Sequence, residues 1–186
     1  MSDYVFRPAR QDDRAGITTL WQAVFGDSEA FISAFLDQMT TPDGCFVAER
    51  GGPILSMGFL LTGPRAGNYS CAYIYAMATH MDHRGHGLAG RIALALRAQA
   101  YGKGIDIVAT LPAEESLVEW YSRRLDMSPV FRKGGEGVVF PDSWARFALE
   151  YCPEHDPDTP GTLLACSRSP AALAAVRGLG WEYPLD

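Results

Sequence analysis

Three closely spaced glycines, Gly85, Gly87 and Gly90, follow Arg84 where an aromatic, apolar segment gives way to an Ala- and Leu-rich one. The pattern predicts a strand that ends at Thr79, a short polar loop and then a helix. Glycines let a ligand approach the backbone, and a helix start provides unpaired N–H groups and the positive end of a dipole. These residues therefore predict an anion site, most naturally for a phosphate or a pyrophosphate.

Arg84, Gly87 and Ala89 match the Arg/Gln-x-x-Gly-x-Gly/Ala signature of the GCN5-related N-acetyltransferases, and the chain resembles this family. The signature lies after a strand and opens a helix, where the family has it. The resemblance covers roughly residues 4–132, while residues 133–186 do not align. It implies an α/β fold of the α+β type, with a mixed, mostly antiparallel sheet of about six to seven strands, helices on both faces and a splayed central strand. We expect one N-acetyltransferase domain over residues 1–186.

The resemblance implies acetyl-coenzyme A (acetyl-CoA) as the co-substrate. The backbone of Met77, Ala78 and Thr79 at the strand end would pair with the pantetheine arm, and an N–H there would polarise the thioester carbonyl. Arg84 is expected to brace the loop and, secondarily, to contact phosphate. The pyrophosphate would be held by the backbone amides of the next residues, namely Gly85, His86, Gly87, Leu88, Ala89 and Gly90.

Tyr121 is a second match to the family, on a helix predicted over residues 114–124. The resemblance implies that it is the general acid that protonates the leaving thiolate. A tyrosine has a reference pKa of about 10, so it is protonated at neutral pH and can donate. The alternative interpretation is a tyrosine packed on the inward face of the helix, with its hydroxyl bonded to the backbone.

Three features depart from the family pattern. Glu114 stands where the family's helix opens with an asparagine, and residues 108–110 lack the glutamate that many members carry in the preceding strand. The helix usually ends in Gly-Phe, but residues 125–127 read Leu-Asp-Met. The general base is therefore unassigned, and Glu114, Glu115, His80 or a chain of waters could serve.

The implied activity is that of an acyltransferase that moves an acetyl group from acetyl-CoA to a primary amine of a small molecule or peptide. Transfer would be direct, because a free amine can attack the thioester within a ternary complex, where positioning supplies much of the rate. No Gly-x-Ser-x-Gly elbow or adjacent Cys and His pair occurs in the sequence, so a dedicated nucleophile is not expected. The sequence indicates neither the acceptor nor the oligomeric state.

Two other functions fit parts of the sequence. Residues 85–90 also spell Gly-x-Gly-x-x-Gly, the fingerprint of NAD(P)-dependent oxidoreductases. In that fold the glycines follow a strand almost directly and an acidic residue comes about 20 positions later. Here a polar loop with Arg84 intervenes, and Asp106 is the nearby acid of a following strand.

The unassigned base and the altered helix end also suit a non-catalytic acetyl-CoA-binding module.

The composition is that of a globular protein, with 186 residues of which 47% are hydrophobic and 20% charged. No apolar run reaches membrane-spanning length and the N-terminus lacks a secretory signal, so we expect a cytoplasmic protein without a membrane partner. The net charge of −6 disfavours nucleic-acid binding.

His80, His83 and His86 recur in the polar loop, but the sequence offers no cysteine or acid cluster to complete a metal site.

Periodicity and turn residues predict the other elements. Tyr69, Cys71, Tyr73 and Tyr75 alternate along the central strand, where they would line a cleft or pack against a helix. Residues 63–68 are expected to form a loop, as are residues 153–161. Residues 138–140 could pair back on the strand before them, and either they or residues 163–167 would form the last strand. Strands are predicted over 4–8, 45–50, 54–62, 69–79, 105–111, 127–133 and 163–167, and helices over 12–25, 28–39, 87–101, 114–124, 144–151 and 170–177.

Overall fold

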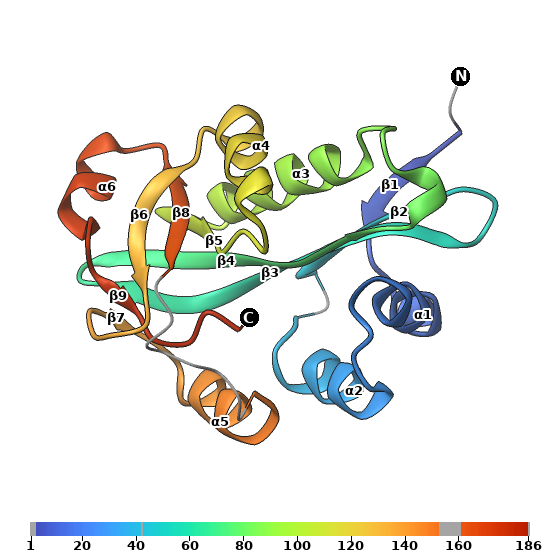
Figure 1. Ribbon diagram of the computed structural model, residues 1–186, viewed down its shortest axis with the longest axis horizontal. Helices are drawn as coiled ribbons and strands as arrows, with labels where there is room; N and C mark the ends of the chain where they lie inside the picture. The colour runs from blue at the N-terminus through green and yellow to red at the C-terminus, as the bar shows by residue number, and fades with distance from the viewer. Residues whose placement is uncertain (1–2, 42, 153–160, 186) are drawn as a thin grey trace. The chain divides into compact units, whose positions relative to one another are not determined.

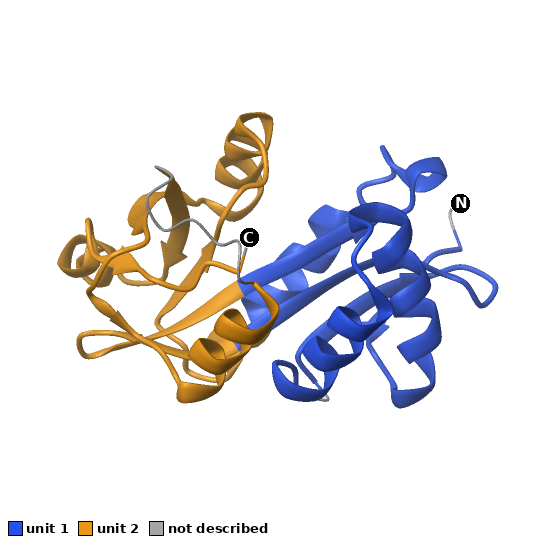
Figure 2. Ribbon diagram, turned by 60° about the horizontal axis from the view of Figure 1, so that its bottom comes forward, with its two compact units in different colours: residues 1–61, 74–98 blue, residues 62–73, 99–186 orange. Residues whose placement is uncertain are grey.

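The computed structural model describes residues 3–41, 43–152 and 161–185 (Figure 1). The chain forms two compact units, unit 1 with Met1–Leu61 and Ile74–Ala98, and unit 2 with Thr62–Tyr73 and Gln99–Asp186 (Figure 2). Strands β3 (Ile54–Ala66) and β4 (Tyr69–Thr79) each run through both units, so neither unit is one continuous stretch of chain. The expectation of a single domain stays a prediction.

Unit 1 joins an antiparallel part of the sheet to helices on both of its faces. Its elements are β1 (Val5–Pro8), α1 (Arg14–Phe25), α2 (Glu29–Gln38), β2 (Cys45–Glu49), the first part of β3, the last part of β4 and most of α3 (Leu88–Gly102). Val5 lies opposite Glu49 in the β1–β2 ladder, and Cys45 lies opposite Phe59 in the β2–β3 ladder. Helices α1 and α2 cover one face and α3 the other (Figure 1).

Local sequence explains how α1 ends and α2 begins. Gly26 adopts the left-handed conformation, with φ 77°, which glycine accepts without strain and which stops α1. Ser28 then caps α2, because its hydroxyl accepts a hydrogen bond from the Phe31 amide at 3.1 Å. The two helices bury Trp21 and Phe35, whose ring centroids are 5.0 Å apart.

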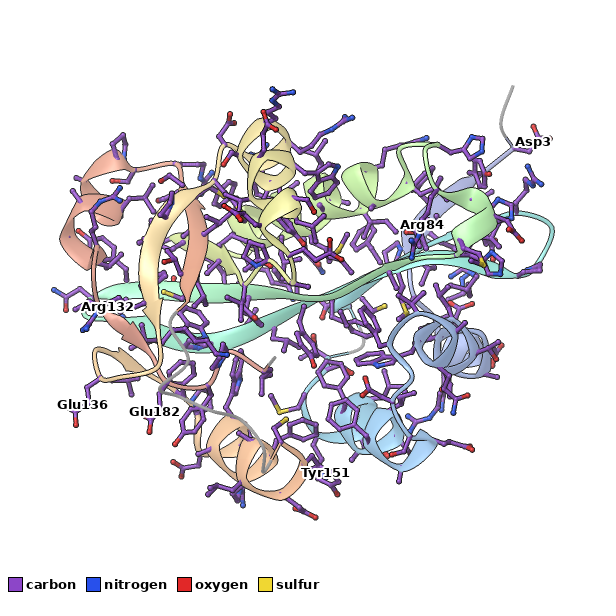
Figure 3. All side chains as sticks on the ribbon, in the orientation of Figure 1. Asp3, Arg84, Arg132, Glu136, Tyr151 and Glu182 are labelled. Carbon is purple, nitrogen blue, oxygen red and sulfur yellow. The ribbon has the colours of Figure 1, made fainter. Side chains whose placement is uncertain are left out.

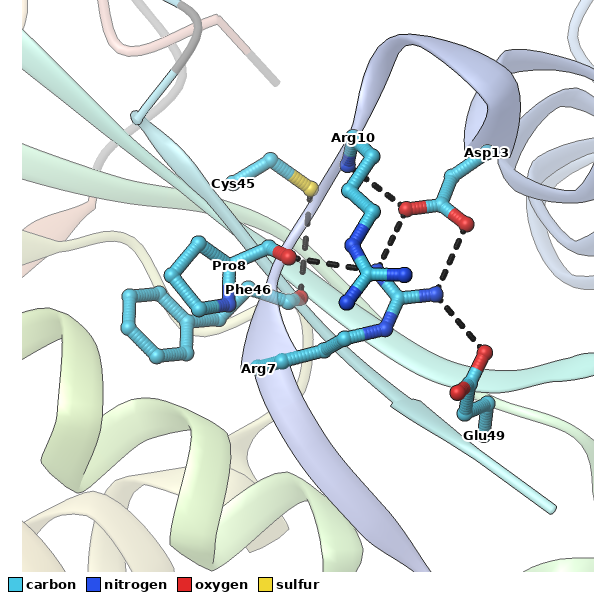
Figure 4. A network of polar contacts seen from close by, with 7 residues as sticks. All are labelled: Arg7, Pro8, Arg10, Asp13, Cys45, Phe46 and Glu49. Carbon is cyan, nitrogen blue, oxygen red and sulfur yellow. Dashed lines mark hydrogen bonds and ion pairs between the residues drawn. The ribbon is translucent and has the colours of Figure 1, made fainter.

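Arg7 ties the first strand to its neighbours (Figure 4). Its guanidinium donates to both carboxylate oxygens of Asp13, at 2.6 and 2.9 Å, and to Glu49 at 2.7 Å. The Arg7 side chain is 12% exposed, and the hydrogen bonds to Asp13 and Glu49 raise its pKa. Asp13 in turn accepts from the Arg10 amide at 2.6 Å, so one ion cluster fixes β1, the 3-10 turn Gln11–Asp13 and the end of β2.

Unit 2 contains the turn between β3 and β4 and the C-terminal elements. These are β5 (Ile107–Thr110), α4 (Glu115–Leu125), β6 (Ser128–Lys133), β7 (Val138–Val139), α5 (Asp142–Tyr151), β8 (Thr162–Ser167), α6 (Pro170–Val176) and β9 (Gly180–Trp181). Hydrogen-bonded neighbours follow the order β1-β2-β3-β4-β5-β8-β6-β9, with β7 paired to β3. The β4–β5 and β6–β9 ladders are parallel, whereas the β5–β8 and β6–β8 ladders are antiparallel.

An aromatic core holds unit 2 together. Trp181 of β9 is fully buried, and its ring lies 5.6 Å from Tyr73, 5.2 Å from Phe131 and 5.3 Å from Phe140. Tyr73 also contacts Trp144 of α5 at 6.1 Å. Tyr73 therefore packs in a core, which is one of the two roles that the alternating tyrosines of β4 suggested.

The sequence predicted most elements but not the full sheet. The mixed, mostly antiparallel sheet with helices on both faces is confirmed, but among the described residues it has nine strands rather than six or seven. The loop predicted over residues 63–68 is wrong, because β3 continues to Ala66, where Arg65 and Ala66 pair with Val139 and Val138. Residues 138–140 therefore do not pair back on β6. The loop predicted over residues 153–161 lies almost entirely outside the described residues.

The sheet places β8 between β5 and β6, so the expectation that residues 163–167 form a strand is confirmed. The two-residue strand β9 was not predicted, since so short a segment carries no periodicity. Within the described ranges, no helix combines the length and apolar character needed to cross a membrane.

Candidate active site

The junction between β4 and α3 carries a run of backbone amides that find no acceptor among the described residues. A 3-10 turn, Met81–His83, follows β4, and the Arg84 amide donates to the Met81 carbonyl at 3.3 Å. The next amide with a backbone partner is that of Arg91, which donates to the Gly87 carbonyl at 3.2 Å. Across the described part of the chain, the amides of residues 85–90 have no hydrogen-bond acceptor in the protein.

Two glycines give this run its shape. Gly85 and Gly87 have φ values of 81° and 74°, a left-handed conformation that L side chains rarely adopt. Apart from the glycine itself and its two chain neighbours, no described heavy atom lies within 4 Å of the position that a Cβ would take at Gly85 or Gly87. The junction is thus an exposed set of N–H donors at the start of a helix, which is the arrangement that binds anions.

A bulge in β4 precedes the junction. Ala76 has φ 48°, a left-handed value for a residue other than glycine. Tyr75 packs against Trp21 and Phe35 on the α1–α2 face, whereas Met77 lies over Gly58 on the α3 face. Residues two apart in a regular strand share a face, so the extra residue at Ala76 reverses the alternation. Bulges of this kind are common beside active sites, where they redirect the backbone.

The ladder between β4 and β5 ends well before β4 reaches the junction. The parallel β4–β5 ladder has three residue pairs and ends where Tyr73 meets Ala109. Residues 74–79 of β4 lie beyond it, as the expected splaying of the central strand requires. At the far end of this segment the Ser56 hydroxyl of β3 donates to the Ala78 carbonyl at 2.8 Å and lies 2.8 Å from the Thr79 hydroxyl.

Side chains around the loop brace it. Arg84 is labelled in Figure 3. Its Nε donates to the Thr79 carbonyl at 3.4 Å, which fits the expected bracing role. His83 Nδ1 lies 2.8 Å from the Tyr4 hydroxyl, and the Tyr4 ring lies 5.9 Å from the His86 ring. In the described residues no three His, Cys, Asp or Glu side chains are grouped to hold a metal ion.

Tyr121 lies in unit 2, on the inward face of α4. It is 6% exposed, and its ring meets Trp120 edge-on at 4.9 Å. Burial raises the pKa of the Tyr121 phenol, and a hydrogen bond with the Thr110 side chain lowers it by less. The phenol therefore stays protonated at neutral pH. Its hydrogen-bond partner is a threonine of β5, and its role as the general acid stays a prediction.

Two of the departures from the family pattern lie at the ends of α4. Glu114 occupies the N-cap position of α4 but makes no cap hydrogen bond, and its carboxylate accepts from the Ser116 hydroxyl at 3.1 Å. Asp126 follows the helix with φ 54° and ψ 34°, the left-handed conformation that the family's glycine would adopt. Aspartate is among the few residues that tolerate it, so the helix ends in the usual way without glycine.

Unit 2 also contains a pocket at the start of α4. Its volume is about 590 Å³, and its lining includes Glu114, Glu115, Val118, Lys133 and Thr162. The pocket thus brings two of the proposed bases together, beside a lysine. His80, the third, lies in unit 1, where its Nδ1 accepts a weak hydrogen bond from the Asp82 amide at 3.3 Å.

Three residues of β3 and β4 that shape the approach to the junction were not singled out from the sequence. Gly58 interrupts the apolar strand β3, and an isolated glycine in a strand signals the close approach of another group, here Met77. Ser56 is a hydroxyl within the apolar first half of the same strand and gave only a weak signal. Ala76 gave none, because alanine has no preference for the left-handed region.

Residues 5–124 match the family described as Acetyltransferase (GNAT) domain. None of the curated proteins is detectably similar in sequence. Among solved structures, the GNAT family N-acetyltransferase YhbS from Escherichia coli, in complex with CoA, has a TM-score of 0.69 at 18% identity over 97% of this chain and 89% of that one. Rv2747 from Mycobacterium tuberculosis, in complex with CoA and NLQ, has a TM-score of 0.62 at 16% identity over 89% and 99%.

A third similar structure is a GCN5-related N-acetyltransferase from Anabaena variabilis, with a TM-score of 0.59 at 16% identity. The match covers 69% of this chain but only 33% of that protein, so the chain spans about a third of its length. At these identities the three structures establish a shared fold.

Proposed function

Because the chain belongs to the GNAT acetyltransferase family, we propose that it transfers an acetyl group from acetyl-CoA to a primary amine of a small molecule or peptide. The amine nitrogen attacks the thioester carbonyl carbon directly while both substrates are bound. The carbon–sulfur bond then breaks, the sulfur takes up a proton and the new amide loses one.

The run of unpaired amides at residues 85–90 is the observation that supports this proposal most strongly. A diphosphate carries several negative oxygens, and backbone N–H groups at a helix start are suited to them by geometry and by dipole. In this proposal Gly85, His86, Gly87, Leu88, Ala89 and Gly90 bind the diphosphate. Arg84 holds the loop in place through its bond to the Thr79 carbonyl.

The end of β4 would hold the arm that carries the thioester. Residues 77–79 lie beyond the β4–β5 ladder, so this strand can offer backbone groups to an extended ligand. One N–H donor of Met77, Ala78 or Thr79 would face the thioester oxygen as negative charge develops on it.

Tyr121 is the proposed acid that protonates the leaving sulfur. Its raised pKa keeps the proton on the phenol over the whole neutral range, which a donor requires. The base that takes the proton of the amine has no assignment, and an amine that binds in its neutral form needs none.

Two assays test the proposal. Calorimetry should give micromolar binding of acetyl-CoA and none of NAD or NADP, whereas the dinucleotide alternative requires the reverse. Release of free thiol should then be measured over a panel of polyamines, aminoglycosides, amino acids and peptides. Binding without thiol release over the whole panel would favour the non-catalytic module, and absence of binding at millimolar acetyl-CoA would refute the proposal.

A further inference from the structure

Ser56 is a buried hydroxyl with no assigned role. It lies on β3 with no exposed surface, and Ser56 and Thr110 are the buried polar side chains among the described residues. Its Oγ lies 2.8 Å from both the Ala78 carbonyl and the Thr79 hydroxyl. A buried polar group of this kind reaches only the partners that the protein provides, so its hydrogen-bond pattern can be worked out in full.

The proton count fixes the direction of each bond. A serine hydroxyl has one proton, and a carbonyl oxygen can only accept, so the Ser56 proton must point to Ala78. The contact with Thr79 then needs a proton from the Thr79 hydroxyl. Thr79 is therefore the donor and Ser56 the acceptor in this pair, and the Thr79 proton is directed inward.

This arrangement determines what Thr79 can offer to a ligand. Thr79 is half-buried at the end of β4, and its hydroxyl oxygen has lone pairs left but no free proton. It can accept a hydrogen bond from a ligand N–H but cannot donate one to a ligand carbonyl or phosphate. The nearby Thr79 carbonyl is already the acceptor for Arg84.

We propose that Ser56 is a positioning residue that makes the Thr79 hydroxyl an acceptor for an amide N–H of the bound pantetheine arm. This inference rests on the proposed function and adds a specific contact to it. The arm contains amide N–H and carbonyl groups, and an acceptor at Thr79 selects the register in which an N–H faces the end of β4. Ser56 acts on the ligand only through Thr79, because its own proton is used by the Ala78 carbonyl.

Calorimetric titration of acetyl-CoA tests the inference with three variants. We expect Thr79→Val to weaken binding about 3- to 10-fold, the range for one net hydrogen bond, because valine keeps the shape and removes the acceptor. Thr79→Ser restores an acceptor and should bind at least about threefold tighter than Thr79→Val. Thr18→Val, at a threonine of α1 that is half-buried like Thr79, is the matched control and should bind like the wild type.

A double-mutant cycle tests whether Ser56 acts through Thr79. Ser56→Ala should weaken binding in the wild type but have less than about a twofold effect in the Thr79→Val background. Equal effects of Ser56→Ala in both backgrounds, or wild-type affinity in Thr79→Val, would overturn the inference. If Ser56→Ala fails to fold, the acetyl-CoA affinities of Thr79→Val and Thr79→Ser still test whether the Thr79 hydroxyl is an acceptor for the ligand. Failure of the wild type to bind acetyl-CoA would instead refute the proposed function itself.

Steady-state kinetics provide a readout that a merely structural role would not produce. Thr79→Val should raise KM for acetyl-CoA by a similar factor and leave KM for the amine acceptor within about twofold. An equal rise in both KM values would contradict a contact specific to the pantetheine arm.

Discussion

At the scale of single residues, the account depends on backbone conformations that few side chains accept. Gly85 and Gly87 take left-handed φ values in open space, so their constraint is conformational rather than steric. Ala76 takes a similar value within β4 and redirects the strand. The backbone conformation at these positions, rather than any side-chain contact, determines the geometry of the junction.

Gly87→Ala should weaken acetyl-CoA binding. An alanine at φ 74° is strained by about 1–2 kcal/mol, and relief of that strain turns the amides of the junction away from the ligand. We expect a rise in Kd of about tenfold by calorimetry. Gly102→Ala, in the last position of α3 and without a left-handed φ, is the matched control and should bind normally. Equal binding by Gly87→Ala and the wild type would contradict the role of the junction.

Tyr121→Phe should lower kcat about 100-fold or more, because the ring and its packing remain while the proton donor is lost. Stopped-assay rates at saturating substrates provide the measurement, with a thermal melt to confirm folding. Tyr101→Phe is the control, since this tyrosine of unit 2 also uses its hydroxyl, as a donor to Cys166. If Tyr121→Phe keeps more than a third of the wild-type kcat, Tyr121 is a packing residue.

At the scale of elements, an ion cluster joins neighbouring strands, and single residues determine where a helix ends. The Arg7 cluster fixes β1 and β2 beside the turn that leads into α1 (Figure 4). At the end of α4, Asp126 performs the conformational task of a glycine. Neither feature could be predicted from the sequence. The sequence does not indicate which charged side chains form ion pairs, nor that Asp126 adopts a left-handed backbone conformation.

Arg7→Met should cost about 2–3 kcal/mol of unfolding free energy, below the range for fully buried pairs because the site is partly exposed. Urea denaturation at pH 7 provides the measurement. Arg14→Met removes an exposed pair with Asp37 and should cost less than about 1 kcal/mol. Equal losses of unfolding free energy in the two variants would show that the Arg7 cluster stabilises the protein no more than an exposed ion pair does.

The Arg7 contribution should also depend on pH in a defined direction. The hydrogen bond from Arg7 lowers the pKa of Asp13 from its usual 3.8. A lowered carboxyl pKa contributes stability that is present above the unfolded value and is lost as the pH falls through the folded value. The difference between wild type and Arg7→Met should therefore shrink below pH 4.

At the scale of the whole molecule, two compact units share the strands β3 and β4. The predicted anion site belongs to unit 1 and Tyr121 belongs to unit 2. Both units bury thiols, Cys45 in unit 1 and Cys71 in unit 2, and burial raises the pKa of each from 9.0 to about 12.

These thiols predict how stability falls in alkali. A raised folded pKa gives stability that is complete below the unfolded value and is lost as the pH rises toward the folded value. Between pH 9 and 12 each buried thiol should therefore steepen the loss of unfolding free energy by about 1.4 kcal/mol per pH unit. Cys45→Ala should reduce the slope by that amount in urea titrations, whereas Val47→Ala, a buried neighbour that does not ionise, should leave the slope unchanged.

How much the sequence could predict depended on the kind of signal. Helices were predicted well, because Gly26, Ser28 and Ser169 mark their ends and apolar residues recur at helical spacing. The length of β3 was missed, because Gly63 and Pro64 suggest a turn while the pairing of Arg65 and Ala66 with β7 comes from far along the chain. The glycine signature identified the junction, but the bulge and the Ser56–Thr79 pair depend on tertiary contacts that have no local pattern.

The most direct test of the central claim is an NMR titration that follows the backbone amides of residues 85–90 while acetyl-CoA is added. The account predicts that these amide resonances move most and become protected from hydrogen exchange, and that inorganic pyrophosphate reproduces part of the change. If acetyl-CoA binds while these amides keep their shifts and exchange rates, the diphosphate is held elsewhere and the account is contradicted.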